Sequence, residues 1–155
     1  MEQIKLDAAS SRILRELQRD SRQTVPELSA KVGLSVSPCW RRVKELEATG
    51  VVRRYTALVE REKVGLSACI LAQVSLLRQT EGAAEQFESA MHACAEVIEC
   101  YSVTGDADYV IKVVLPDVKA YDAFLHRVMF KIKDIGTLRS MVVLREVKYE
   151  TALPV

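Results

Sequence analysis

The chain has 155 residues, of which 49% are hydrophobic and 28% charged, and its formal net charge is +1. This composition excludes a disordered or fibrous protein, and the length suffices for one ordinary core or two small ones. The sequence has no run of 18 apolar residues and no signal-peptide pattern at its N-terminus, so we expect a cytoplasmic protein without a membrane partner.

Residue usage argues against metal and disulfide chemistry. The four cysteines, at positions 39, 69, 94 and 100, show no Cys-x-x-Cys spacing, and only His92 and His126 could join them. We therefore expect reduced thiols, no metal site and no cofactor.

Charge is distributed unevenly along the chain. Residues 1–60 hold 11 Lys and Arg against 8 Asp and Glu, whereas residues 61–155 hold 11 against 13. The first part is thus the one in which a contact with nucleic-acid phosphates is expected.

The N-terminal residues show helical periodicity. Asp7 is a suitable N-cap for a first helix, and a second helix begins after Thr24, because Glu27 follows at capping-box spacing and Pro26 occupies the first turn. The side chains that the first helix turns inward are predicted to be Ile13, Leu14 and Leu17.

A third helix follows the second across a glycine turn. Gly33 can take positive φ, Leu34 can tuck inward, and Ser35 offers a hydroxyl N-cap. Two short helices joined in this way predict a helix-turn-helix. The inward stripe of the third helix is predicted to be Val36, Cys39, Trp40, Val43 and Leu46, with Trp40 as its large anchor and Cys39 as a small buried hydrophobe rather than a thiol sensor.

The opposite face of the third helix is polar. Ser37, Arg41 and Glu45 centre on this face, and Arg42 and Lys44 flank it. Guanidinium groups suit guanine edges and phosphates, and recognition helices touch bases near their N-termini. Solvated surface charges are the alternative, but the cap, the glycine turn and the two stripes together favour DNA binding.

The helical pattern ends near residue 50. Residues 51–59 are rich in β-branched and aromatic side chains and predict a wing or linker strand, and the polar segment 60–65 marks a domain boundary. We expect a winged helix-turn-helix DNA-binding domain over residues 1–60 and a second domain over residues 61–155.

Strand and helix patterns alternate in the second domain. Strands are predicted at 66–77, 97–104, 108–115 and about 137–149, and helices at 81–94 and 117–132. The order βαββαβ describes a ferredoxin-like sandwich with both helices on one face of an antiparallel sheet. The chain as a whole is predicted to be α+β.

One face of this sheet has no cover within the chain. The strands at 66–77 and 108–115 are apolar on both faces, whereas a face in water would be polar. We expect a second copy of the chain to bury the open face, since a homodimer also supplies the pair of recognition helices that a twofold DNA site needs.

Short motifs along the chain agree in order and spacing with one known family. They are Leu6-Asp7, Ile13-Leu14-x-x-Leu17-Gln18, Glu27-Leu28-Ser29, Val32-Gly33-Leu34-Ser35, Ser37-Pro38-Cys39, Arg42-Val43, Leu46-Glu47, Glu99-Cys100, Val103-x-Gly105-Asp106-x-Asp108-Tyr109 and Val142-Val143. Over residues 4–153 the chain resembles the Lrp/AsnC (feast/famine) family of transcriptional regulators. Its Cys39-Trp40 pair and its tail are similar to the branch of local regulators of amino-acid breakdown.

The resemblance implies a dimer, often assembled into an octamer, that binds double-stranded operator DNA and responds to an amino acid or related metabolite. Ser37 and Arg41 are expected to contact bases. The full set of expected DNA contacts is Arg22, Thr24, Lys31, Ser35, Ser37, Pro38, Arg41, Arg42 and Lys44. Effector binding would then change assembly or the spacing of the DNA-binding heads.

The implied effector site lies at the glycine-aspartate hairpin. A turn glycine exposes N–H groups to a carboxylate, and an aspartate can accept from an ammonium, although an ordinary β-turn explains the same residues. The expected effector residues are Thr104, Gly105, Asp106, Asp108, Phe130, Met141, Val142 and Val143. Phe130 and Met141 depart from the pattern of the family's leucine-responsive member, which leaves the identity of the effector open.

Two other functions fit parts of the sequence. A ligand-independent architectural protein that bends DNA would show the same helix-turn-helix and sheet. A small ferredoxin-like enzyme is the other, but His92 and His126 belong to no recognisable nucleophile, phosphate or metal motif, so we expect no catalytic residue.

Overall fold

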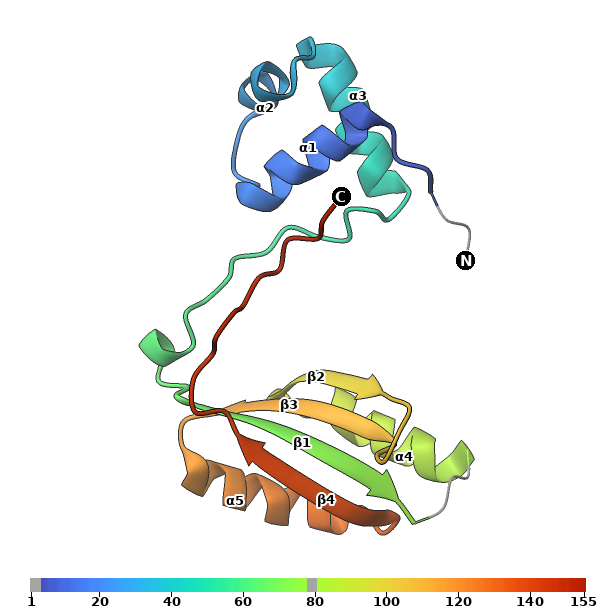
Figure 1. Ribbon diagram of the computed structural model, residues 1–155, viewed down its shortest axis with the longest axis vertical. Coiled ribbons are helices and arrows are strands. Elements are labelled where there is room, and N and C mark those ends of the chain that lie inside the picture. Colours follow the sequence, from blue (N-terminus) through green and yellow to red (C-terminus); the bar gives the residue numbers. More distant parts are fainter. Residues whose placement is uncertain (1–3, 78–80) are drawn as a thin grey trace. The chain divides into compact units, whose positions relative to one another are not determined.

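The computed structural model describes residues 4–77 and 81–155, which form two compact units. The first unit contains the chain up to Leu58 together with Lys148–Val155, and the second contains Val59–Val147 (Figure 1). Residues 1–3, at the start of the first predicted domain, lie outside the described part. Within that part, none of the helices combines the length and apolar character needed to cross a bilayer.

Three helices build the first unit, and their starts follow the capping residues. They are α1 (Ala8–Arg19), α2 (Val25–Val32) and α3 (Val36–Ala48). Asp7 accepts a hydrogen bond of 2.7 Å from the Ser10 amide, and Thr24 and Glu27 form the predicted capping box. Ser35 occupies the N-cap position of α3, but its side chain makes no capping hydrogen bond, so this part of the prediction was wrong.

The core of the first unit is small and formed by all three helices. Its buried side chains are Ile13, Leu14, Leu28, Val32, Cys39, Val43 and Leu46. The turn at Gly33 has φ 68°, as predicted, and sends α3 back across α1 and α2. The Arg12 guanidinium donates to the Val32 carbonyl at 3.1 Å and so ties α1 to the end of α2.

The predicted strand at 51–59 does not form. Residues 53–60 have no regular secondary structure, and no described strand pairs with them. Their β-branched and aromatic residues favour a strand only where a neighbouring strand completes the ladder.

The C-terminal tail also differs from the prediction. The last strand ends at Val142 instead of continuing to 149, and Lys148–Val155 belongs to the first unit. The Gln18 side chain of α1 holds this tail, because its Nε2 donates to the Leu153 carbonyl at 3.1 Å and its Oε1 accepts from the Leu153 amide at 2.6 Å.

The second unit has the predicted ferredoxin-like architecture. Its elements are β1 (Ala68–Leu76), α4 (Glu81–His92), β2 (Val97–Ser102), β3 (Tyr109–Leu115), α5 (Val118–Arg127) and β4 (Ile135–Val142), with short 3-10 helices η1 (Glu62–Val64) and η2 (Met129–Lys131). The sheet order is β2-β3-β1-β4 and every neighbouring pair is antiparallel. The helix predicted over 117–132 ends at Arg127 and is followed by η2.

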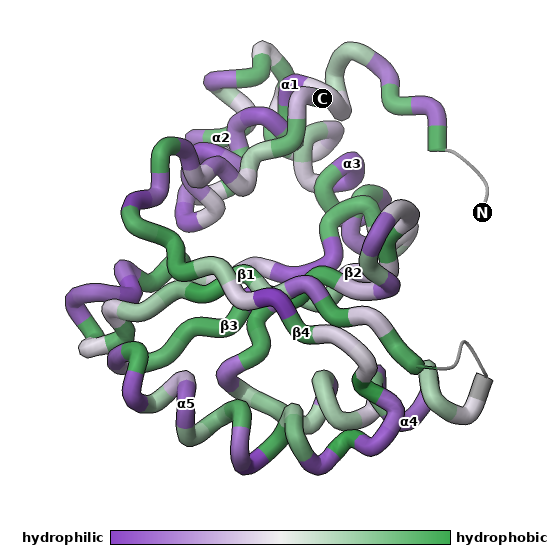
Figure 2. The backbone as a smooth tube through the Cα atoms, turned by 60° about the horizontal axis from the view of Figure 1, so that its bottom comes forward, coloured by the Kyte–Doolittle hydropathy of each residue, from purple (hydrophilic) through white to green (hydrophobic). Residues whose placement is uncertain are grey.

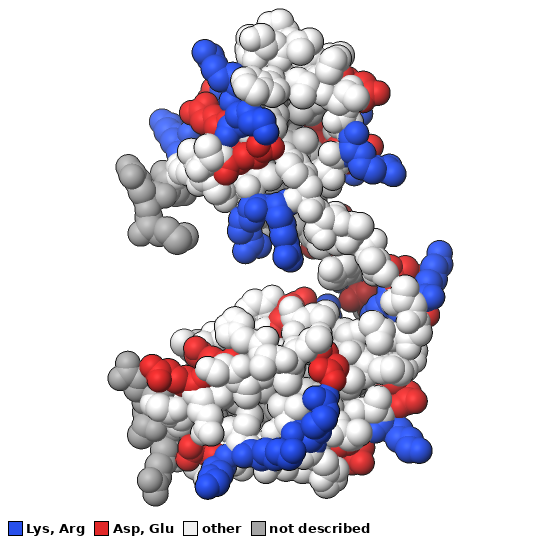
Figure 3. All heavy atoms as spheres, turned by 180° about the vertical axis from the view of Figure 1, so that it is seen from behind, with Lys and Arg blue, Asp and Glu red and all other residues white. Residues whose placement is uncertain are grey.

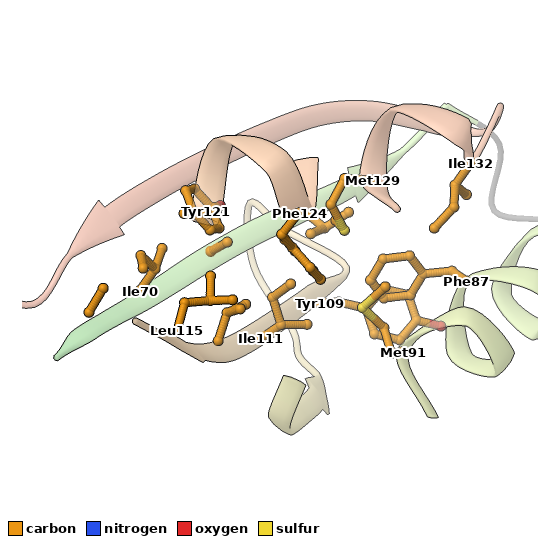
Figure 4. Close-up of a cluster of buried hydrophobic side chains, with 14 residues drawn as sticks. Ile70, Phe87, Met91, Tyr109, Ile111, Leu115, Tyr121, Phe124, Met129 and Ile132 are labelled. Carbon is orange, nitrogen blue, oxygen red and sulfur yellow. The ribbon is translucent and has the colours of Figure 1, made fainter. Parts of the chain in front are cut away.

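The helices cover one face of the sheet and bury its core. Figure 4 shows side chains of β1 and β3, among them Ile70 and Ile111, meeting Phe87 of α4 and Phe124 of α5. The two central strands are largely hydrophobic along their length (Figure 2), although helices packed on one face alone require only alternate apolar residues.

The open face of the sheet is less apolar than predicted. Leu71 pairs with Lys112 and Met141, and Gln73 pairs with Val110 and Arg139, so each of these rows mixes apolar and polar side chains. Lys112 lies 3.5 Å from the Glu99 carboxylate and 3.9 Å from that of Glu146. The open face is therefore amphipathic, with charges that the alternation of hydrophobic residues did not reveal.

We expect Phe124→Ala to lower the free energy of unfolding by about 3–5 kcal/mol, because Phe124 is 1% exposed and its removal leaves a cavity in the core. Phe130→Ala is the matched control, since Phe130 is 61% exposed. Chemical denaturation followed by circular dichroism measures both. Equal losses in the two variants would contradict the assignment of Phe124 to the core.

Candidate functional site

The exposed face of α3 is the first candidate surface. Burial of Cys39, Val43 and Leu46 fixes the rotation of the helix, and this rotation leaves Ser37 and Arg41 exposed near its N-terminal half. Among the described residues, none forms a hydrogen bond or ion pair with the Arg41 guanidinium. Both groups are therefore available to an external partner.

Two members of the predicted inward stripe lie outside the core. Trp40 is 52% exposed and Val36 is 48% exposed. The prediction that Trp40 anchors α3 was thus wrong. The apolar side chains of α3 occupy a wider arc of the helix than two short partner helices can cover. Only Cys39, Val43 and Leu46 therefore enter the core.

Arg42 holds α3 against the start of α1. Its guanidinium donates to the Asp7 carboxylate at 2.6 Å and to the Ser10 hydroxyl at 3.2 Å. The backbone and side-chain hydrogen bonds from Ser10, followed by the bond from Arg42, lower the pKa of Asp7 to about 2. Arg42 differs from Arg41 in being already bound within the unit.

A second polar cluster closes the C-terminal end of α3. The Glu47 carboxylate accepts from Lys44 at 2.7 Å and from the Tyr55 hydroxyl at 2.9 Å. Burial and this carboxylate raise the pKa of Tyr55 to about 12, so the phenol stays neutral. The cluster fixes the start of the segment after α3 and keeps the Lys44 ammonium near the exposed face.

The remaining residues predicted to contact DNA lie around α2 and the turn. Arg22 and Lys31 are exposed, although Arg22 also pairs with Asp20 at 3.2 Å. Ser35 is exposed, Pro38 is half-buried, and the Thr24 hydroxyl is engaged in the capping box. On the face drawn in Figure 3, basic and acidic side chains of this unit are interspersed, so positive charge does not form one continuous patch there.

The glycine-aspartate hairpin is the second candidate site, and the structure shows what holds it. Asp108 anchors the hairpin to β1: its carboxylate accepts from the Leu76 amide at 2.7 Å, and its own amide donates to the Val74 carbonyl. Gly105 has φ 118°, a conformation that favours glycine. Asp106 is exposed beside it.

A hollow on the open face of the sheet lies next to this hairpin. It is lined by Gln73, Ser75, Asp106, Ala107, Thr137 and Arg139. The Ser75 hydroxyl donates to the Asp106 carbonyl at 3.2 Å, which keeps the hairpin at the rim. The hollow thus brings together one carboxylate, one guanidinium and several neutral polar groups.

The structure gathers only half of the predicted effector residues. Thr104, Gly105, Asp106 and Asp108 share the hairpin, but Phe130 lies in η2 on the helix side of the sheet. Of the other three, Met141 and Val142 end β4 and Val143 follows it; Val142 pairs with Ile70 on the helix-covered face. A single chain therefore does not unite the eight residues into one site.

Four lining residues, Gln73, Ser75, Thr137 and Arg139, were missed by the sequence prediction. The sequence does contain a signal for them, because they are polar residues at alternate positions of strands that are otherwise rich in apolar residues. The strand pairing Gln73↔Arg139 and Ser75↔Thr137, which places them side by side, cannot be obtained from one strand alone.

The cysteines show no sign of a shared site. All four are unbridged thiols, two buried (Cys39 and Cys69), one half-buried (Cys94) and one exposed (Cys100). Burial raises the pKa of the Cys39 thiol, in keeping with a packing role. In the described part of the chain, no group of three or more His, Cys, Asp or Glu side chains could hold a metal ion.

Two family models match separate parts of the chain. Residues 6–53 match the model of a winged helix-turn-helix DNA-binding family, and residues 69–153 match that of the Lrp/AsnC ligand binding domain. The leucine-responsive regulatory protein of Klebsiella pneumoniae is 38% identical over 148 residues, which is 96% of this chain and 90% of that protein.

Solved structures show the same likeness over the whole chain. A transcriptional regulator of Neisseria meningitidis in complex with L-Met superposes with a TM-score of 0.92 at 37% identity, covering 97% of each chain. An AsnC family transcriptional regulator of Agrobacterium tumefaciens gives a TM-score of 0.92 at 38% identity, covering 96% of this chain and 97% of that one.

The hydrogen bonds that Ser10 and Arg42 donate to Asp7 predict a pH-dependent stability. Because the pKa of Asp7 is lowered to about 2 in the folded chain, its contribution is present above the ordinary value of 3.8 and is lost as the pH falls toward 2. Asp7→Asn keeps a capping oxygen but removes the charge. We expect its melting temperature to lie below that of the natural chain near neutral pH and the gap to close under acid.

The measurement is thermal unfolding across this pH range, with Asp122→Asn as the control, since Asp122 is exposed and its ion-pair partner among the described residues is His126 at 3.9 Å. A gap between the Asp7 variant and the natural chain that stays constant with pH would contradict the role of the charged Asp7 carboxylate.

Proposed function

Since the chain belongs to the Lrp/AsnC family of DNA-binding transcriptional regulators, we propose that α3 enters the major groove of an operator with Ser37 and Arg41 directed at the bases. The observation that carries this proposal is the fixed rotation of α3, which buries Cys39, Val43 and Leu46 and leaves Ser37 and Arg41 on the outside. A helix of this kind fits the major groove, and the guanidinium suits the O6 and N7 acceptors of guanine.

The other cationic residues support binding without specifying the sequence. Lys31, Arg22 and Lys44 are exposed around α2 and α3 and are suited to phosphates. We assign Arg42 a different part, because its pairing with Asp7 places it in the framework that positions α3. Its contribution to DNA binding is therefore indirect.

We further propose that the hollow beside the hairpin receives the amino-acid effector. The Arg139 guanidinium suits an α-carboxylate, and the exposed Asp106 carboxylate suits an α-ammonium. Asp108 serves as a positioning residue, since its carboxylate is used to hold the hairpin on β1. The complex of the Neisseria relative with L-Met supports an amino acid as the ligand class.

The open face of the sheet is the surface we propose for dimerisation. It has no cover within its own unit, and its rows mix apolar side chains with charges, which suits a specific contact between two copies. The hollow lies on the same face, so effector binding there would be coupled to assembly. These roles are regulatory, and we assign no catalytic role to His92 or His126.

Arg41→Ala and Arg42→Ala are expected to separate base recognition from the positioning of α3. Arg41→Ala should lower the preference for the operator about ten-fold, leave a salt-sensitive residual affinity and keep the melting temperature, because its guanidinium has no partner among the described residues. Arg42→Ala should lower the melting temperature, because it leaves Asp7 unpaired.

Mobility-shift titrations test this with duplexes that the natural chain selects from a random library, at several salt concentrations. Unchanged operator preference in Arg41→Ala, with selective binding by the natural chain, would contradict the assigned base contact.

Arg139→Gln and Asp106→Asn are expected to weaken amino-acid binding by about ten-fold or more each, since each removes one charged partner of the ligand. Isothermal calorimetry with L-methionine, L-leucine and the other standard amino acids gives the affinities. Arg145→Gln is the matched control, because Arg145 is exposed and does not line the hollow. Equal affinities for all three variants and the natural chain would place the effector elsewhere.

A further inference from the structure

The exposure of Trp40 is a feature that the fold of the first unit does not require. It is the only tryptophan of the chain, it lies on a helix whose other apolar residues include three buried ones, and half of its surface meets solvent. Val36 lies one turn earlier and is exposed to a similar extent. Residues four apart on a helix are neighbours, so the two side chains form one apolar strip.

This strip lies directly beside the residues proposed to contact bases. Along α3, Val36, Trp40 and Lys44 follow each other at four-residue spacing, and Ser37 and Arg41 occupy the adjacent row at the same spacing. Val36 and Trp40 are the first and fifth residues of the helix. They therefore belong to the N-terminal half, the part of a recognition helix that reaches base edges.

The polar groups beside this strip indicate which partner would bind there. A hydroxyl and a guanidinium border it, from Ser37 and Arg41, and the Lys44 ammonium, bound to Glu47, lies at its end. An apolar protein partner would leave the Arg41 guanidinium without water or counter-charge. The major groove meets both needs, because it offers anionic phosphates and acceptor atoms together with one apolar group, the C5 methyl of thymine.

We propose that Trp40, with Val36 beside it, determines operator specificity by apolar contact with thymine methyl groups in the major groove. This inference rests on the proposed DNA-binding function and adds to it a second kind of base contact. Arg41 and Ser37 would recognise hydrogen-bonding edges, and the strip would recognise methyl groups of neighbouring base pairs in the same groove. An aromatic ring of this size covers a large apolar area when such a contact forms.

Replacement of thymine by deoxyuridine tests the contact at the level of one methyl group. Duplexes selected by the full natural chain from a random library are resynthesised with uracil at one thymine position at a time, which leaves every hydrogen-bonding edge of the base pair unchanged. We expect one or two positions at which uracil weakens binding by about three- to four-fold, as expected for one buried methyl group.

The same duplexes measured with variants give a double-mutant cycle. We expect Trp40→Ala to bind the thymine and uracil duplexes equally at those positions, whereas Arg41→Ala retains the sensitivity to uracil. Trp40→Leu is the matched apolar variant and should recover part of the effect. Thermal unfolding of each variant controls for folding, and the exposure of Trp40 predicts melting temperatures close to that of the natural chain.

Tryptophan emission supplies a second readout, because no other tryptophan contributes. We expect a selected duplex to protect Trp40 from acrylamide quenching. A selected sequence that tolerates uracil at every position, or a Trp40 equally quenched with and without DNA, overturns this inference while leaving the proposed function intact. Protection that follows protein concentration without DNA would instead assign Trp40 to a contact between copies. A library from which the natural chain selects no sequence overturns both proposals.

Discussion

The burial of one side of α3 is the constraint on which the proposed recognition depends. Cys39, Val43 and Leu46 enter a core of seven apolar side chains, and the Arg42–Asp7 ion pair adds a polar clamp at the start of α1. Together they fix both the rotation and the axial position of a 13-residue helix, about 20 Å long. The side chains that remain outside, Ser37 and Arg41 among them, are then presented in one defined order.

In the second unit, burial of one face of the sheet likewise determines which side chains stay exposed. Helices α4 and α5 bury one face, and antiparallel register determines which side chains share the other. Asp108 pins the hairpin to β1, so Asp106 is held at the rim of the hollow that contains Arg139. A carboxylate and a guanidinium separated by neutral polar groups are complementary to a zwitterion, which is the chemical feature common to amino acids.

Local signals in the sequence were sufficient for most of the elements and for the fold. The Thr24–Glu27 capping box, the positive φ of Gly33 and the Asp7 cap all form as predicted, because each involves residues within a few positions of one another. The βαββαβ order and its sheet topology also follow from periodicity and the handedness of crossovers. What failed depended on distant partners: Arg42 binds a residue 35 positions away, and the strand predicted at 51–59 lacks a neighbour. Periodicity likewise marked Trp40 as apolar but could not show how much of the stripe two short helices would cover.

Methylation interference on a selected operator tests most directly the claim that α3 lies in the major groove. Methyl groups are placed at guanine N7, which faces the major groove, or at adenine N3, which faces the minor groove, before the full chain is added. If α3 lies in the major groove, N7 methylation within the selected site blocks binding by the natural chain, and Arg41→Ala loses this interference at one guanine. Interference confined to adenine N3, or absent from both grooves, would contradict this placement of α3.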